Sequence, residues 1–210
     1  MNLAPLIELE EDPVPIVMVV GAQLKRALTS DTHRKIANDL EGCFALSSTT
    51  DPQKVSVDIN KSKITVTRGI SSSAKIVVHL NFNKPEAKPR IDGLLRHPLF
   101  AINVGKLLEP PPQNWITEAK SYWQAVSDQP GMPASIKLVS TPDNFELVLG
   151  EENTEHDVII HGKPQTLLEL VNGSLVFAEA AMAGKIKVNS SVEHLVILTQ
   201  VSIKRLLGEL

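Results

Sequence analysis

The chain has 210 residues, 42% of them hydrophobic, and its 21 Lys and Arg residues against 24 Asp and Glu residues give a formal net charge of −3. This composition predicts a soluble globular protein of one large domain or of two with about 100 residues each. The absence of a basic stripe argues against a nucleic-acid partner. The single cysteine, Cys43, has no partner for an internal disulfide, so we expect a reducing interior such as the cytoplasm.

The first half of the chain is predicted to begin with helices and to continue as a meander of strands. Ile16, Val20 and Leu24 recur at helical spacing, and Asp31 can cap a second helix. Short β-type runs follow between residues 42 and 82, separated by turn-forming residues, as is typical of an antiparallel meander. After a polar loop comes an apolar helical segment at 93–108 that ends at three prolines.

The proline run at 110–112 is the best candidate for a linker, because consecutive prolines neither continue a helix nor join a central strand. The second half then predicts an amphipathic helix from Trp115, three strands, two short helices, one more strand and a last helix at 192–207. The two short helices end at Gly173 and Gly184, where we expect the left-handed backbone of a helix stop.

The order of helix, strands, loop and apolar helices therefore occurs twice in the sequence. We interpret this as an internal duplication with two domains, 1–112 and 113–210. The apolar run at 15–20 is too short to cross a bilayer and follows acidic residues, so neither a membrane span nor a signal peptide is expected.

One stretch resembles a known family. Residues 156–195, HDVIIHGKPQTLLELVNGSLVFAEAAMAGKIKVNSSVEHL, combine a strand, a helix of the form LLxLxxG, a short helix of small and apolar residues, and GKIKV on an edge strand. This pattern is similar to the C-terminal part of the sterol carrier protein type 2 family. The first half resembles that family in its helix and meander, but it lacks a GKIKV counterpart and is expected to have no clear last strand.

The resemblance implies an α+β fold of two similar sterol-carrier-like units, each a mainly antiparallel sheet covered by helices. In the family, a five-stranded sheet and its helices enclose an apolar tunnel for sterols, fatty acids or acyl-CoA. It therefore implies non-enzymatic lipid binding or transfer without a cofactor, mainly in the C-terminal half. The residues expected to line this tunnel are Leu147, Val158, Ile160, Leu167, Leu170, Val171, Phe177, Ala181, Met182, Ile186, Val188, Leu195 and Leu198.

The alanines of the second short helix allow two interpretations. Ala178, Ala180, Ala181 and Ala183 are small, and small residues on a core-facing helix either leave room for an apolar ligand or allow close packing on a sheet. Where many family members carry a bulky aromatic residue before the glycine, this chain has Ala181 and the flexible Met182.

The last helix carries two neighbouring apolar stripes, a wider face than one sheet usually needs. The stripes are Val192, Val196, Ile203 and Leu207, and Leu195, Leu198, Ser202 and Leu206. The excess could line a tunnel, contact the other half of the chain, or form the interface of a homo-oligomer.

No catalytic motif is recognisable: the chain has no GxSxG elbow, phosphate loop or GxGxxG turn. His156 and His161 are five apart on one predicted strand and point to opposite faces, so they cannot share a metal. The basic residues Lys84, Lys88, Arg90 and Arg96 either meet a lipid headgroup or form a solvated loop.

The alternative to a lipid carrier is an accessory protein-interaction module with a filled core, and an enzyme acting on a lipid ranks third.

Overall fold

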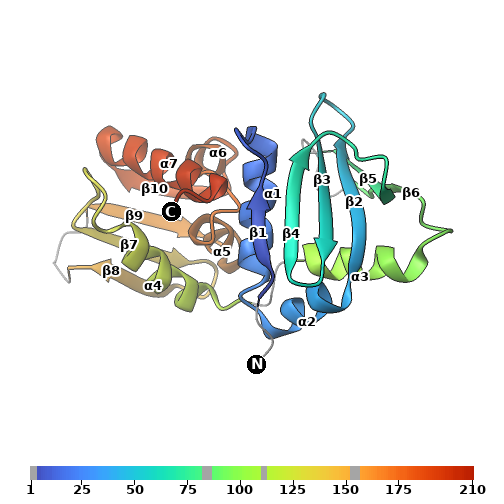
Figure 1. The fold of residues 1–210 in the computed structure, drawn as a ribbon. Helices are drawn as coiled ribbons and strands as arrows, with labels where there is room; N and C mark the ends of the chain where they lie inside the picture. The colour runs from blue at the N-terminus through green and yellow to red at the C-terminus, as the bar shows by residue number, and fades with distance from the viewer. Residues whose placement is uncertain (1–3, 82–86, 110–112, 152–156) are drawn as a thin grey trace. The chain divides into compact units, whose positions relative to one another are not determined.

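The computed structural model describes residues 4–81, 87–109, 113–151 and 157–210, and the chain divides into two compact units, Met1–Pro111 and Pro112–Leu210. Each unit is a β-sheet covered by helices (Figure 1). The predicted α+β class with two mainly antiparallel sheets is thereby confirmed. The expected proline linker at 110–112 lies outside the described residues.

The first unit contains six strands and three helices among its described residues. They are β1 Leu6–Leu9, α1 Pro15–Ala27, α2 Asp31–Asp39, β2 Glu41–Ser48, β3 Lys54–Asn60, β4 Lys63–Arg68, β5 Ala74–Leu80, β6 Arg90–Asp92 and α3 Pro98–Leu108. The two helices and four strands expected up to residue 82 are all present, because long periodic segments specify their own secondary structure.

Strand β2 is central in the first sheet, whose order is β1-β4-β3-β2-β5-β6. It pairs antiparallel with β3, Phe44 opposite Val57, and parallel with β5, Leu46 opposite Val78. The inward side chains of these strands and the apolar faces of α1 and α3 form one continuous core. Strands β2, β3 and β4 form the predicted antiparallel meander, but β5 does not continue it. Instead of pairing with β4, β5 returns to the other side of β2 and pairs with it in parallel.

Two strands of this sheet differ from the expectation. β1 pairs parallel with β4 at one edge, and the three-residue strand β6 pairs antiparallel with β5 at the other, Val78 opposite Ile91. The first half thus has the last strand that its sequence was expected to lack. β6 has too few residues to show a period, and the sequence LIEL of β1 does not alternate apolar with polar residues, although its burial alternates. Each strand is fixed by the neighbouring strand to which it hydrogen-bonds.

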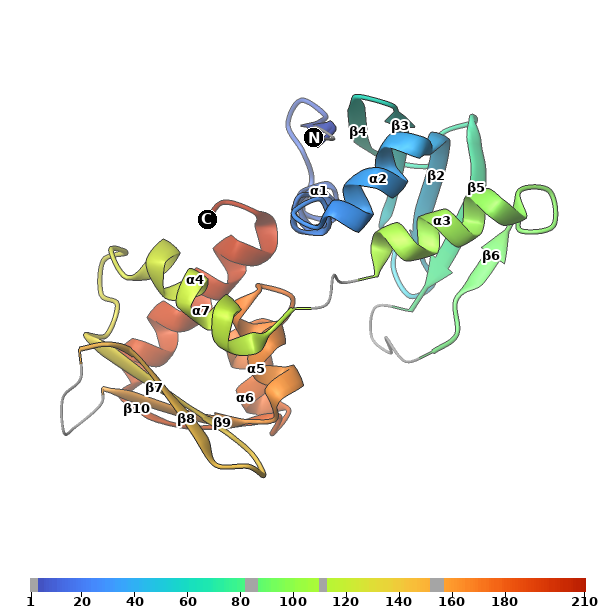
Figure 2. The same cartoon turned by 90° about the horizontal axis from the view of Figure 1, so that it is seen from below.

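The second unit contains four strands and four helices among its described residues. They are α4 Trp115–Val126, β7 Ser135–Ser140, β8 Phe145–Gly150, β9 Val158–Gly162, α5 Pro164–Val171, α6 Phe177–Met182, β10 Ile186–Ser190 and α7 Val192–Leu207. In Figure 2 all four helices lie on one face of this sheet. Gly173 and Gly184 have φ angles of 78° and 66°, which confirms the predicted left-handed helix stops.

The sheet of the second unit has the order β10-β9-β7-β8, four described strands where the resemblance implied five. Its central pair, β7 and β9, is parallel, with antiparallel neighbours on both sides. The strands β3-β2-β5-β6 of the first unit follow the same sequence of pairings. This shared pattern is consistent with an internal duplication.

Candidate ligand-binding cavity

The predicted tunnel of the second unit corresponds to a nearly filled core. Six of the predicted residues surround its central space: Ile160, Leu167, Leu170, Val171, Phe177 and Leu198. The volume of that space is about 20 Å³, which is room for about one water molecule and not for a lipid chain. A tunnel in this half of the chain is therefore not confirmed.

The other predicted residues do not enlarge this space. Val158 and Ile186 are buried in the core, while Leu147, Ala181, Val188 and Leu195 are partly buried against it. Met182 is 81% exposed and lies on the surface. The flexible side chain that was expected to adapt to a ligand thus faces solvent.

The alanines of α6 serve close packing. Ala180 is fully buried, and α6 contacts α7 and β10. At the start of α6, the backbone N–H of Phe177 donates a hydrogen bond of 3.0 Å to the hydroxyl of Ser202 on α7. Of the two interpretations of these small residues, the geometry favours short helix-to-helix and helix-to-sheet distances.

The large side chain of Tyr122 from α4 also lines this small space. Its burial raises the pKa of the phenol to about 12, although the nearby Arg205 guanidinium opposes the shift. Arg205 lies over the ring, 5.4 Å from its centroid. Tyr122 is therefore a neutral, packed side chain at physiological pH.

A much larger cavity lies in the first unit, between the sheet and helices α1 and α3. Its volume is about 430 Å³, within the range of about 300–1,000 Å³ that is usual for small-molecule sites. Aliphatic side chains form most of its wall, and Gln23 contributes the one polar side chain among the described lining residues. The wall consists of Ile16, Val19, Val20, Gln23, Leu46, Ile76, Val78, Leu80, Pro89, Ile91, Ala101, Val104, Gly105 and Leu108.

The difference between the two units follows from how their helices cover their sheets. Within the described ranges, the second unit places four helices on four strands, whereas the first places three helices on six strands. In addition, α3 presents Ala101 and Gly105 to the cavity, and a Cβ added at Gly105 would meet no heavy atom within 4 Å. Sparse cover and small side chains together leave apolar volume unfilled.

None of the thirteen predicted lining residues belongs to this cavity. The signal that could have found it is the same one that drew attention to α6, namely small residues on an apolar helix. In the sequence LFAINVGKLL, Ala101, Val104 and Gly105 recur at helical spacing and face the cavity wall. The first half has no GKIKV counterpart, so the family resemblance predicts the ligand site in the second half instead.

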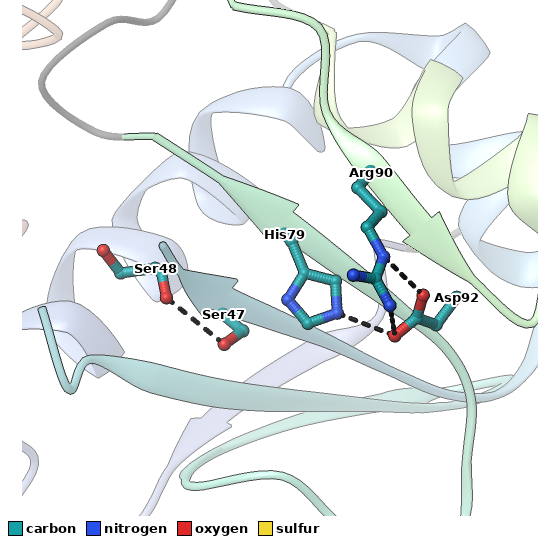
Figure 3. Close-up of polar contacts among 5 residues, drawn as sticks. All are labelled: Ser47, Ser48, His79, Arg90 and Asp92. Atoms are coloured by element: carbon teal, nitrogen blue, oxygen red, sulfur yellow. Dashed lines mark hydrogen bonds and ion pairs between the residues drawn. The ribbon is translucent and has the colours of Figure 1, made fainter. Parts of the chain in front are cut away.

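A polar cluster links β5 to the neighbouring edge strand β6 of the first sheet (Figure 3). The ring nitrogen Nε2 of His79 on β5 lies 2.9 Å from Oδ2 of Asp92 on β6. Arg90 donates to the same carboxylate, its Nε lying 3.0 Å from Oδ1. The hydrogen bond from His79 makes the largest contribution to lowering the pKa of Asp92, and the hydrogen bonds from Arg90 lower it further. The cluster fastens β6, which carries the cavity residue Ile91, to β5.

This cluster is not an assembled nucleophile–base pair. Ser47 lies opposite His79 in the parallel pairing of β2 and β5, but its hydroxyl donates to the carbonyl oxygen of Ser48 at 3.5 Å. A catalytic serine would need its hydroxyl within hydrogen-bond reach of the base. Among the described residues no group of three or more His, Cys, Asp or Glu side chains is arranged to hold a metal ion. His156, Lys84 and the acidic residues 152 and 155 lie outside the described residues.

Comparisons with known proteins find similar folds. No family model and no curated protein matches the chain. Among solved structures, palmitated SCP2L2 from Aedes aegypti is similar at 17% identity and a TM-score of 0.34, over 42% of this chain and 90% of that one. The sterol carrier protein domain 2 of Helicoverpa armigera follows at 15% identity and a TM-score of 0.33, over 44% of this chain and 85% of that one.

A third similar structure is the apo form of sterol carrier protein 2 from Yarrowia lipolytica. It matches at 10% identity and a TM-score of 0.21, over 92% of this chain and 90% of that one. These proteins bear the name of the family that residues 156–195 resemble. At identities and TM-scores as low as these, the similarities carry no conclusion about what this chain binds. No helix in the described part of the chain has the length and apolar character of a membrane span.

Proposed function

We propose that this protein binds a lipid or fatty acyl ligand without chemical turnover, and that the ligand occupies the cavity of the first unit. The observation that carries the proposal is the aliphatic wall around about 430 Å³ of unfilled space. Burial of hydrocarbon contributes about 0.8 kcal/mol per CH₂ group, so an alkyl chain is the occupant for which this wall is suited. The resemblance of residues 156–195 to a sterol carrier family adds to this proposal.

Gln23 gives the cavity one polar contact within an apolar wall. Ligand sites of this kind use a few polar groups to fix the orientation of a mostly apolar molecule. We propose that the Gln23 amide contacts the carbonyl or hydroxyl end of the ligand. The absence of an assembled nucleophile near the described cavity wall supports binding or transfer over catalysis.

Two measurements test the proposal. Protein purified under native conditions and then denatured should release a lipid detectable by mass spectrometry. A fluorescent fatty acid should bind with an affinity that Gly105→Leu, in the first unit, weakens and that Ala181→Phe, in the second, leaves unchanged. The opposite ranking of the two variants would place the ligand in the second unit.

The second unit supports a different candidate function, that of an accessory interaction module. Its core is nearly filled, and Val192, Val196 and Ile203 of α7 are exposed. Large exposed aliphatic residues on one helix face are typical of association surfaces. We propose that α7 mediates self-association of this chain. Val196→Glu should then convert dimers to monomers in analytical ultracentrifugation, and a monomeric wild type would contradict the proposal.

We further propose that the protein acts in a reducing compartment such as the cytoplasm. Cys43 is buried in β2 as a free thiol, and burial raises its pKa. A protonated, buried thiol reacts slowly with oxidants and disulfides. Fractionation of the native cells, with detection of the untagged protein, tests this localisation.

A further inference from the structure

Helix α3 is apolar on both of its faces. Its inner face contributes Phe100, Val104 and Leu107 to the core of the first unit. On its outer face, Leu99 is 75% exposed and Ile102 is 52% exposed. A surface helix of a water-soluble protein normally carries polar residues on its outer side, so this outer face requires a separate explanation.

The turn that leads into α3 extends the same surface. Leu95 is 97% exposed and Leu94 is 41% exposed. The turn is fixed by hydrogen bonds from the backbone N–H groups of Arg96 and His97 to the carbonyl of Gly93. In Figure 1 this turn, between β6 and α3, extends beyond the strands of its own sheet. We call the four exposed residues, Leu94, Leu95, Leu99 and Ile102, the α3 outer face.

Cationic residues outnumber carboxylates in the segment that carries the α3 outer face. Between residues 88 and 108 the sequence has four cations and one carboxylate, although the whole chain has a net charge of −3. The carboxylate, Asp92, is already paired with Arg90 and His79. Arg96 and Lys106 are exposed, and Leu99 and Ile102 lie between them in the sequence. Exposed leucines between basic residues are typical of helices that lie in the interface of an anionic membrane.

From this arrangement we propose that the α3 outer face docks onto the surface of an anionic lipid bilayer. The inference rests on the proposed lipid-binding function and extends it, because the opposite side of α3 carries Ala101, Gly105 and Leu108 of the cavity wall. A docked α3 separates the cavity from the bilayer by the thickness of one helix.

The test is vesicle co-sedimentation of the full chain, without added ligand. Wild-type protein should bind vesicles of phosphatidylcholine mixed with phosphatidylserine, and bind vesicles of phosphatidylcholine alone more weakly. The double variant Leu95→Asn, Leu99→Asn should lower the partition coefficient by at least about tenfold, because both side chains lose their burial in the interface. Leu6→Asn with Ile70→Asn is the matched control: both residues are exposed aliphatics of the same unit outside the α3 outer face.

The basic residues are tested separately. Arg96→Gln and Lys106→Gln should each lower binding to the anionic vesicles by about fivefold, and both effects should weaken as salt screens the surface charge. A label on Leu99→Cys provides a readout that does not depend on sedimentation, because the native Cys43 is buried. Its fluorescence should shift to shorter wavelength on anionic vesicles, and that of a label on Ile70→Cys should not.

The proposal is overturned if the wild-type protein does not bind anionic vesicles. It is overturned equally if the Leu95→Asn, Leu99→Asn variant binds them with the same affinity as the matched control. It is also overturned if wild type is a dimer that the same variant dissociates, since a second copy is then the occupant. Its failure is distinguishable from failure of the lipid site: Gly105→Leu should reduce binding of a fluorescent fatty acid in vesicle-free solution while vesicle docking persists.

Discussion

Substitution of Gly105 by leucine fills part of the cavity in the first unit without disturbing α3. Gly105 lies inside the helix and lines the cavity, and an added Cβ would meet no heavy atom within 4 Å. Glycine in a helix interior is less favourable than alanine by about 0.8–1.0 kcal/mol, and leucine is close to alanine. We therefore expect Gly105→Leu to unfold at the same denaturant concentration as wild type or at a higher one.

The same substitution should weaken ligand binding. The leucine side chain takes the place of about three methylene groups of a bound alkyl chain, and each contributes about 0.8 kcal/mol. The expected loss is about 2.4 kcal/mol, or roughly fiftyfold in the dissociation constant of a fluorescent fatty acid. Gly105→Ala is the graded control: it gives the same gain in helix propensity but occupies about one methylene, for a loss of roughly fourfold.

The two variants must be compared by fluorescence titration together with urea unfolding. Stability that is unchanged or raised, combined with weaker binding, places the ligand beside α3. If Gly105→Leu keeps wild-type affinity at unchanged stability, then the alkyl chain does not occupy this cavity and the reasoning from its volume is wrong.

Two further predictions concern the contacts that hold the cavity wall. Hydrogen bonds from His79 and Arg90 lower the pKa of Asp92 in the folded protein. The stability that these bonds contribute is present above the ordinary pKa of an aspartate, about 3.9, and is lost as pH falls through the lower pKa of the folded state. Asp92→Asn should therefore remove this decrease of the unfolding free energy at acid pH. The buried His33 ring on α2 lies 2.9 Å from the carbonyl oxygen of Glu109, so His33→Ala should cost about 1–3 kcal/mol of unfolding free energy in urea, whereas an unchanged midpoint would show that the bond is not made in solution.

The secondary structure could be predicted from sequence where segments are long and periodic. The last helix was expected at 192–207, and α7 is Val192–Leu207. The glycine stops at Gly173 and Gly184 were found because a positive φ angle is a local requirement with a recognisable residue type. The sequence does not predict β6, because three residues carry no period and the position of β6 depends on hydrogen bonds to the preceding strand, β5.

The location of the cavity could not be predicted in the same way. Ala180 of α6 and Gly105 of α3 are both small residues on short apolar helices, yet Ala180 is fully buried in a packed core and Gly105 borders empty space. The difference arises from the volume that surrounding elements supply. Side chains of α4, α5 and α7 reach the space next to α6, whereas α1 and α3 are the helices that supply described lining residues to the cavity beside α3. A sequence pattern shows that a side chain is small, but it does not show whether side chains from other elements fill the space beside it.

The same pairing of strands can thus enclose either a nearly filled core or a large apolar cavity, depending on how the helices cover it. In the second unit, α5 and α6 stand between β9 and β10 and bring Leu167 and Phe177 to the centre of the core. In the first unit, the space beside α3 is a cavity of about 430 Å³. The two sheets therefore share a pattern of pairing, while the described helices that cover them differ. The GKIKV pattern, which reports a sheet edge, therefore carries little information about which unit holds a ligand.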